Sequence, residues 1–226
     1  MMKYLTLAGL VLTGTAASLA GTIVGTVHAT PPPGPPEPAG GGAYESRRYK
    51  FAEKIDYQRL RDFVVYIDQP MAVAAPATAP LAAVTTQRDA SFDPHVLPIT
   101  VGTVVRWPNE DDIYHNVYSD SEMKQFDLKF YKQEKVPEVT FDQVGRVDVF
   151  CAIHAKMHCI VLVLPSPFFA TADAKGRFVI KDVPAGTYKL RAWHERLPGQ
   201  TKEVVVPAAG EVRVDFALGL GGLPKN

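Results

Sequence analysis

The chain is poor in cysteine, in net charge and in the motifs on which many enzymes depend. It has two cysteines in 226 residues, and its 24 basic residues balance 24 acidic ones. A neutral chain has no electrostatic footprint for nucleic acid, so we expect no nucleic-acid partner. The sequence also has no His-x-His pair, no nucleophile elbow and no phosphate-binding loop. These absences predict that the protein is not an enzyme.

A long unbroken apolar run is also absent. The first residues carry Lys3 and then an apolar stretch that several threonines and glycines dilute, whereas an uncleaved membrane anchor needs about 20 apolar residues. The stretch closes with small residues that suit cleavage by signal peptidase before Gly21. We predict a signal peptide at residues 1–20 and a periplasmic or secreted mature chain. A retained membrane tether is the alternative.

Cys151 and Cys159 are the only pair available for a disulfide in an oxidising compartment. If both lie on extended chain, their Cα atoms are farther apart than the roughly 7 Å that a disulfide allows. We therefore predict a free, functional Cys151.

Short β-strand patterns crowd the middle of the chain, and no helical stripe of comparable length competes with them. Seven segments rich in valine, isoleucine and aromatic residues lie between residues 96 and 164, separated by turn residues. Such close spacing predicts an antiparallel sandwich or barrel. The segments are 96–101, 103–107, 115–119, 126–130, 138–141, 146–151 and 158–164.

Further strand patterns flank this region on both sides. Residues 21–29 alternate between apolar residues and small or polar ones, which is typical of a strand. Residues 62–68 have a continuous apolar centre, as expected where both faces of a strand are covered. After residue 168 the strands surround a turn at Gly176, which suits positive φ. This C-terminal piece is small for a sandwich that folds alone, so we expect it to need partners. Between and after these elements we expect a Pro/Gly-rich loop at 31–42, a short helix at 46–61, a connector at 70–83 and strands at 203–206 and 211–216.

The segment CAIHAKM, residues 151–157, places Cys151, His154 and Met157 at intervals of three. Electron-transfer copper sites take two neutral imidazoles and one thiolate in a plane, with a weak thioether on the axis. One tight loop can supply three of these donors because it curls around the ion, and the fourth must come from a neighbouring strand. His115, which opens an earlier strand, is the obvious remote donor. We predict one copper ion, cycling between Cu(I) and Cu(II), at these four residues. A single buried cysteine or methionine is ordinarily a packing residue of the core. Four candidate donors in this order along the chain favour a metal site instead.

Several stretches around these residues resemble the cupredoxin family, the blue-copper fold of plastocyanin and amicyanin. They are FDPH at 92–95, GTVVRWPNED at 102–111, HNV at 115–117 and GRVDVFC at 145–151. The resemblance covers residues 84–164 and implies a Greek-key sandwich, the ligand order His, Cys, His, Met, and transient docking with redox protein partners. It also implies that Asn116 holds the two ligand-bearing loops together.

The ligand loop departs from the family pattern in two ways. Ala155 replaces a common proline, which leaves the loop less rigid, and His158 and Cys159 follow Met157. His158 is a competing fourth ligand, but strand geometry should point it away from Met157. We therefore expect His158 to be exposed to solvent and Cys159 to pack inward.

Three further residues are accessory candidates: His95, His194 and Glu195. If they met in space, they would form a second metal or proton-handling site. We expect exposed polar roles for them instead.

Residues 168–195 resemble the carboxypeptidase regulatory-like, or transthyretin-like, β-sandwich. The pattern is Gly176-x-Phe178 followed by VPAGTYKL at 183–190. Members of this family usually open with strands like residues 21–27 and 64–67, which here precede the copper region. We therefore expect the cupredoxin segment to be inserted into this sandwich, or packed as one body with it. Two sequential domains are the alternative.

The predicted protein is all-β, a Greek-key cupredoxin sandwich joined to, or inserted in, a transthyretin-like sandwich. Its predicted function is that of an exported mononuclear copper protein that carries single electrons. One alternative is a surface module that binds carbohydrate or a cell-surface protein through the C-terminal sandwich, with accessory copper. Another is a periplasmic copper chaperone. The expected parts are the signal peptide at 1–20, N-terminal strands and linker at 21–80, the cupredoxin domain at 81–165, the regulatory-like domain at 166–218 and a tail at 219–226.

Overall fold

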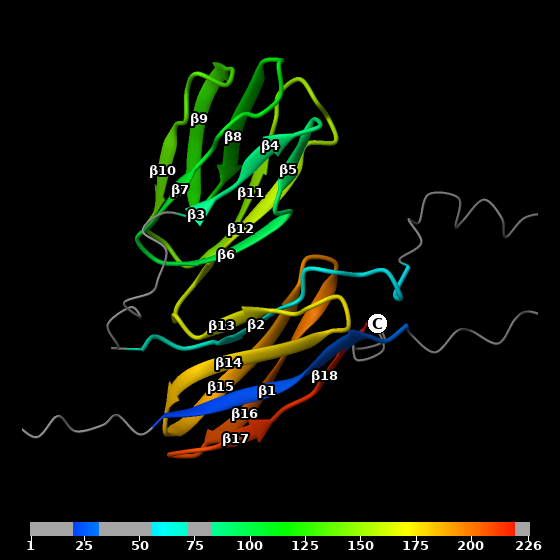
Figure 1. Ribbon diagram of the computed structural model, residues 1–226, viewed down its shortest axis with the longest axis vertical. Helices are drawn as coiled ribbons and strands as arrows, with labels where there is room; N and C mark the ends of the chain where they lie inside the picture. Colours follow the sequence, from blue (N-terminus) through cyan, green and yellow to red (C-terminus); the bar gives the residue numbers. More distant parts are fainter. Residues whose placement is uncertain (1–19, 32–55, 72–82, 220–226) are drawn as a thin grey trace, which may run out of the picture.

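The computed structural model describes residues 20–31, 56–71 and 83–219, and the regular elements in these ranges are β-strands. They form two sandwiches, an upper and a lower one in Figure 1, in agreement with the all-β prediction. The described residues leave out residues 1–19 of the predicted signal peptide, most of the loop at 31–42, the first part of the helix at 46–61 and most of the connector at 70–83. The described ranges contain no helix long and apolar enough to cross a membrane.

The upper sandwich has a five-stranded sheet of order β6-β12-β11-β8-β9, a three-stranded sheet of order β10-β7-β3, and the hairpin β4-β5. All seven strands predicted between residues 96 and 164 are present. Most strand pairs of the upper sandwich are antiparallel, as expected, whereas the pairs β12-β6 and β3-β7 are parallel. The strands are β3 (Ala83–Val84), β4 (Thr86–Arg88), β5 (Ser91–Asp93), β6 (Val96–Thr100), β7 (Thr103–Arg106), β8 (His115–Ser121), β9 (Lys124–Tyr131), β10 (Glu138–Phe141), β11 (Gly145–Phe150) and β12 (His158–Leu164).

The lower sandwich combines strands from before and after the upper one. Its sheets have the orders β14-β1-β17, with β18 also paired to β1, and β13-β2-β15-β16. The chain therefore leaves the lower sandwich after β2, forms the upper one and returns (Figure 1). The exact domain limits given above stay a prediction. The strands are β1 (Ala20–Ala29), β2 (Val64–Ile67), β13 (Phe169–Thr171), β14 (Arg177–Pro184), β15 (Gly186–His194), β16 (Leu197–Val206), β17 (Glu211–Arg213) and β18 (Phe216–Leu218).

The turn before β14 depends on a glycine, as predicted. Gly176 has φ +75°, a region that side-chain-bearing residues rarely adopt. A Cβ atom at this position would also lie 2.2 Å from the carbonyl oxygen of Val27 on β1. Glycine therefore permits both the turn and the close approach of β1.

The two sandwiches share an apolar interface. Strands β2 and β12 are buried on both faces, because alternate side chains point into their own sandwich and toward the other one. This double burial explains the continuous apolar centre of residues 62–68. Buried apolar surface contributes about 25 cal/mol per Å² to stability, so each sandwich stabilises the other. The shared cluster contains Val64, Tyr66, Val96, Ile160, Leu162 and Leu164.

Both cysteines are unpaired and buried, as predicted for a chain without a disulfide. Cys159 packs in the core of the upper sandwich with Trp107 and Phe141, and burial raises the pKa of its thiol above the usual value. The prediction that Cys159 is a packing residue is confirmed.

Candidate metal centre

Three of the predicted donors meet at one end of the upper sandwich. His115 opens β8, Cys151 follows β11, and His154 lies in the loop before β12. The Nδ1 atoms of the two histidines are 3.0 Å apart, and Cys151 Sγ lies 3.9 Å from His115 Nδ1 and 3.6 Å from His154 Nδ1. Residues 36 and 39 positions apart in the sequence thus converge on one point.

The separations fit a metal ion. An ion about 2.0–2.1 Å from each imidazole nitrogen and about 2.3 Å from a sulfur separates nitrogens by about 3.5 Å and nitrogen from sulfur by about 3.8 Å in a trigonal plane. The two nitrogen–sulfur distances lie close to these values, and the nitrogen–nitrogen distance is about half an ångström shorter. Two imidazoles and one thiol are also the donor set that copper takes in trigonal sites.

The loop that carries two of the donors is closed by its own backbone. The Met157 amide donates to the carbonyl of His154 over 2.9 Å, and the Cys151 amide donates to the carbonyl of Met157 over 3.3 Å. These bonds curl residues 151–157 into a compact turn between β11 and β12. Met157 is 1 % exposed and belongs to the same core cluster as Cys151. Its role as the axial ligand stays a prediction.

His115 is held from behind by Asp111, which sequence reasoning missed. Asp111 Oδ2 accepts from His115 Nε2 over 2.8 Å, so the imidazole presents Nδ1 to the other donors. The same carboxylate accepts from the backbone amides of Asp89 and Ala90, over 2.7 and 3.0 Å. Burial acts to raise the pKa of the Asp111 carboxyl, but the bonds from Ala90, His115 and Asp89 together hold it below its usual value.

The turn between β4 and β5 is shaped to donate to this carboxylate. Asp89 and Ala90 have φ values of 53° and 50°, which side-chain-bearing residues adopt uncommonly. Both of their amides point at Asp111. The sequence signal that was available is the spacing of four residues between Asp111 and His115.

Asn109 orders the loop that leads to His115. Its side-chain amide donates to the carbonyls of Ile113 and Tyr131, over 2.9 and 3.1 Å, and its oxygen accepts from the Asp111 amide over 2.9 Å. Asn116, in contrast, donates to Asp127 on β9 over 2.7 Å. That bond ties β8 to β9, and the predicted tie between the two ligand-bearing loops stays a prediction.

The accessory candidates separate into two places. His95 Nε2 lies 3.1 Å from Glu195 Oε2, so these two residues do meet. His194 does not join them. It is 4 % exposed and lies against the ring of Phe63, with centroids 4.8 Å apart, and burial lowers the pKa of its imidazole. The expectation of an exposed His194 is wrong because its strand turns the ring into the lower core.

His158 is half-buried rather than exposed. It lies with His95 and Glu195, away from the group of three donors described above. Its Nε2 donates to Asp148 over 2.8 Å, and its ring stacks on Phe150. His158 was expected to point away from Met157, and its place in this second group agrees with that expectation. The expectation that it is exposed to solvent is wrong.

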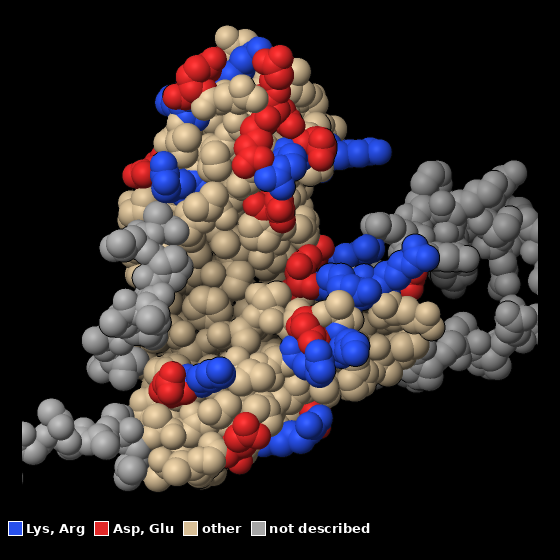
Figure 2. Space-filling view, in the orientation of Figure 1, with Lys and Arg blue, Asp and Glu red and all other residues tan. Residues whose placement is uncertain are grey.

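Apolar side chains surround the ligands at the surface. Ile153, beside His154, is 52 % exposed, and Ile113 and Tyr114, before His115, are 46 % and 57 % exposed. A shallow hollow of about 510 Å³ lies against the ligand loop and is lined by Ala90, Ile153 and His154 among others. On the face shown in Figure 2, basic and acidic side chains lie beside each other on both sandwiches, so neither sign dominates that face.

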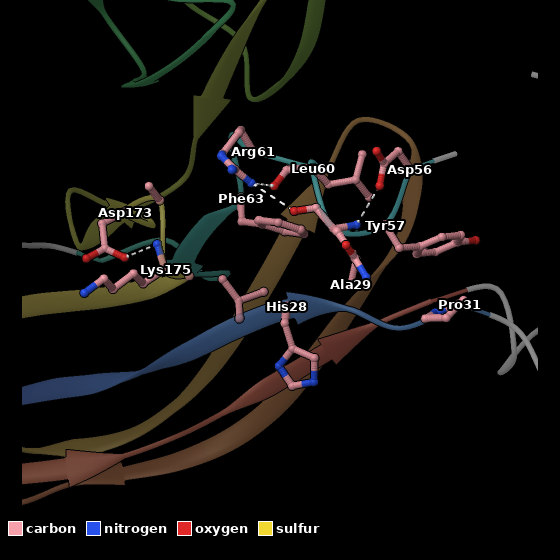
Figure 3. Close-up of a pocket in the computed structure, with 14 residues that line it drawn as sticks. His28, Ala29, Pro31, Asp56, Tyr57, Leu60, Arg61, Phe63, Asp173 and Lys175 are labelled. Atoms are coloured by element: carbon pink, nitrogen blue, oxygen red, sulfur yellow. Dashed lines mark hydrogen bonds between the residues drawn. The ribbon is translucent and has the colours of Figure 1, made fainter. Parts of the chain in front are cut away.

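A separate hollow of about 570 Å³ lies on the lower sandwich. It is formed where the end of β1, residues 56–63 and the turn at 173–176 come together (Figure 3). Tyr57, Arg61 and Lys175 are among its lining residues, which makes it partly aromatic and partly charged.

A comparison with known families agrees with the carboxypeptidase regulatory-like resemblance noted in the sequence. A model of the carboxypeptidase regulatory-like domain matches residues 161–219, and no curated protein matches the chain. Among solved structures, a Cu-containing nitrite reductase (NirK) from Thermus scotoductus SA-01 is 32 % identical over 42 % of this chain, with a TM-score of 0.35, and this chain covers 25 % of that protein. An amicyanin in its reduced Cu(I) form at pH 4 is 25 % identical over 44 % of this chain and 97 % of its own, with a TM-score of 0.35. A purple cupredoxin from Nitrosopumilus maritimus is 24 % identical over 36 % of this chain and 98 % of its own, with a TM-score of 0.34.

Proposed function

We propose that the protein is an exported mononuclear copper protein that carries single electrons between redox partners. His115, Cys151 and His154 hold the ion, and Met157 is the weak axial ligand. The single observation that carries the proposal is the convergence of two imidazole nitrogens and one thiol sulfur within 3.9 Å of one another. Copper in such a donor set supplies a one-electron couple between Cu(II) and Cu(I).

Burial of the donors supports electron transfer over catalysis. His115 is 0 % exposed and Cys151 is 5 % exposed, and the hollow beside the loop is shallow. A catalytic metal site keeps an open coordination position for water or substrate. Neighbouring side chains bury His115 and Cys151 instead, which suits a site that exchanges only electrons.

Preorganisation of the metal donors supports fast electron exchange. Asp111 fixes the tautomer and the ring direction of His115, and the two backbone bonds of the loop fix Cys151 and His154. Donors held in this way move little between oxidation states, so little reorganisation opposes the transfer. The same rigidity disfavours the chaperone alternative, because a carrier that passes its ion on must open its ligand loop.

His154 is the half-exposed donor, and we assign the exit for the electron to its ring edge. The exposed Ile153 beside it supplies apolar contact area without a deep pocket. Transient redox partners dock on small surfaces, of less than about 1,200 Å² in total.

Voltammetry of the copper-loaded protein tests this proposal. We expect a reversible one-electron wave and an intense visible band from the thiolate bound to Cu(II), both absent in Cys151→Ala. A colourless complex that binds only Cu(I) would instead support the chaperone. The binding-module alternative has a defined place to test, the hollow of Figure 3. Glycan binding that is lost in Tyr57→Ala, in a protein without the visible band, would support that alternative and overturn electron transfer.

A further inference from the structure

A second group of metal-binding side chains bridges the two sandwiches. His95 precedes β6, His158 opens β12, and Glu195 lies in the turn between β15 and β16 of the lower sandwich. One potential donor atom from each of the three lies within 4.8 Å of the other two. The rings of His95 and His158 meet edge to face, with centroids 5.5 Å apart.

The hydrogen bonds of the two histidines define which nitrogens are free to bind. Nδ1 of His95 faces the backbone carbonyl of His158 over 3.1 Å, and a carbonyl only accepts, so Nδ1 carries the proton in the neutral ring. Nε2 of His158 faces Asp148 Oδ1 over 2.8 Å, so that nitrogen is also a donor. The lone pairs of the neutral rings are then on His95 Nε2 and His158 Nδ1.

This arrangement places acceptors against one another. His95 Nε2 lies 3.1 Å from Glu195 Oε2, and in the neutral ring both atoms carry lone pairs. Two acceptors at hydrogen-bond distance need a proton or a cation between them. Partners that hold each imidazole by its other nitrogen are what metal-ligating histidines ordinarily have.

The local charge also favours a cation. Arg146 pairs with Asp148 through two bonds of 2.8 and 2.6 Å, which neutralises that carboxylate. Glu195 then leaves the group with one net negative charge when the two histidines are neutral. The side chains of His95, His158 and Glu195 are 37 %, 26 % and 21 % exposed, so an ion can enter and keep a water ligand.

We propose that His95, His158 and Glu195 form a second site, distinct from the copper site, for a divalent cation of borderline softness such as Zn²⁺. Two histidines and one glutamate, with a fourth position left to water, are a donor set that zinc takes. Two donors come from the upper sandwich and one from the lower. A bound ion therefore clamps the interface at the edge of the shared apolar cluster.

Zinc binding is measured in a variant that lacks the thiolate of the copper site, Cys151→Ala, so that the result does not depend on the proposed function. Circular dichroism first establishes that this variant is folded. Equilibrium dialysis with metal analysis and calorimetry at pH 7.5 should find one Zn²⁺ per chain. Adding His95→Ala or Glu195→Gln should weaken binding by at least tenfold, and Asp148→Asn, which replaces the charged acceptor of His158 with a weaker neutral one, by about 10- to 100-fold.

His28→Ala in the same background is the matched control, because His28 is an exposed histidine on β1 outside the group. Its affinity for Zn²⁺ should be unchanged. Zinc should also raise the thermal midpoint of the Cys151→Ala protein and not that of the variant that also carries Glu195→Gln. The proposal is overturned if the Cys151→Ala protein binds no Zn²⁺ at about 1 mM, or if the variant that also carries Glu195→Gln binds it as tightly. If the Cys151→Ala protein does not fold, wild-type protein saturated with copper is titrated with Zn²⁺ instead, and it should bind one Zn²⁺ per chain.

Discussion

Replacing Asp111 with asparagine tests whether the metal centre depends on the carboxylate behind His115. Oδ1 of Asp111 accepts from the Asp89 amide, and Oδ2 accepts from both the Ala90 amide and His115 Nε2. An amide has one oxygen for these three donors. If that oxygen takes the Oδ2 position, the amide nitrogen faces the Asp89 N–H, and that bond is lost.

The loss has a magnitude that can be estimated. A hydrogen bond to a charged group contributes about 1.5–3 kcal/mol, so Asp111→Asn should lower the free energy of unfolding of the metal-free protein by about that amount. The remaining bond to His115 is weaker because the acceptor is neutral. Changes to the hydrogen-bond partner of a metal-binding histidine weaken metal affinity by about 10- to 100-fold.

Denaturant unfolding of the metal-free protein measures the first effect, and competitive copper titration measures the second. Asp112→Asn is the matched control, since Asp112 is 93 % exposed and its contact with Lys132 is a surface ion pair. The control should change stability by less than about 0.5 kcal/mol and leave copper affinity intact. If Asp111→Asn matches the control in both measurements, the assigned role of Asp111 is wrong.

Three other consequences can be checked. A fragment that ends at Leu164 lacks the strands that pair with β1 and β2 and leaves the apolar face of β12 exposed. It should therefore aggregate in size-exclusion chromatography, and a stable monomer would contradict the shared interface. Gly25→Ala places a Cβ 1.8 Å from the Val214 carbonyl oxygen, so the backbone must move apart. This movement should lower the free energy of unfolding by about 1–3 kcal/mol in denaturant unfolding. An unchanged midpoint would refute the close packing. Bonds from Arg213 and Thr26 lower the pKa of Asp215 to about 2, so this carboxylate stabilises the fold above its ordinary pKa near 4 and loses that contribution as the pH falls toward 2. Asp215→Asn should therefore lower the thermal midpoint at pH 7 and have little effect at pH 2; an equal loss at both values would contradict this assignment.

Most of the strands could be predicted because they are long enough to show a pattern. The seven segments between residues 96 and 164 carry valine, isoleucine and aromatic residues bounded by turns, and all seven are strands. Strands β3, β4 and β5 have only two or three residues and show no periodicity. The strand expected at 211–216 is interrupted between Arg213 and Phe216, although both parts pair with β1 in the same register. At the interruption the Asp215 side chain accepts from the backbone amide and the hydroxyl of Thr26 on β1.

The candidate site was predictable where donors follow the chain and unpredictable where they depend on tertiary contacts. Cys151 and His154 share one loop, and His115 opens a strand in the same sheet, so their proximity follows from the fold that the sequence resembles. Asp111 stands in an acidic run after Asn109, and apart from its spacing of four residues from His115 nothing local distinguishes it from its neighbours until the turn at Asp89 and Ala90 folds onto it. The meeting of His95 with Glu195 likewise depends on how the two sandwiches pack.

X-ray absorption at the copper edge of the copper-loaded protein tests the central claim most directly. Two nitrogen donors and one short sulfur contact are expected, and the sulfur contact should disappear in Cys151→Ala while the two nitrogens remain. A copper shell of nitrogen and oxygen alone in the wild-type protein would contradict the account.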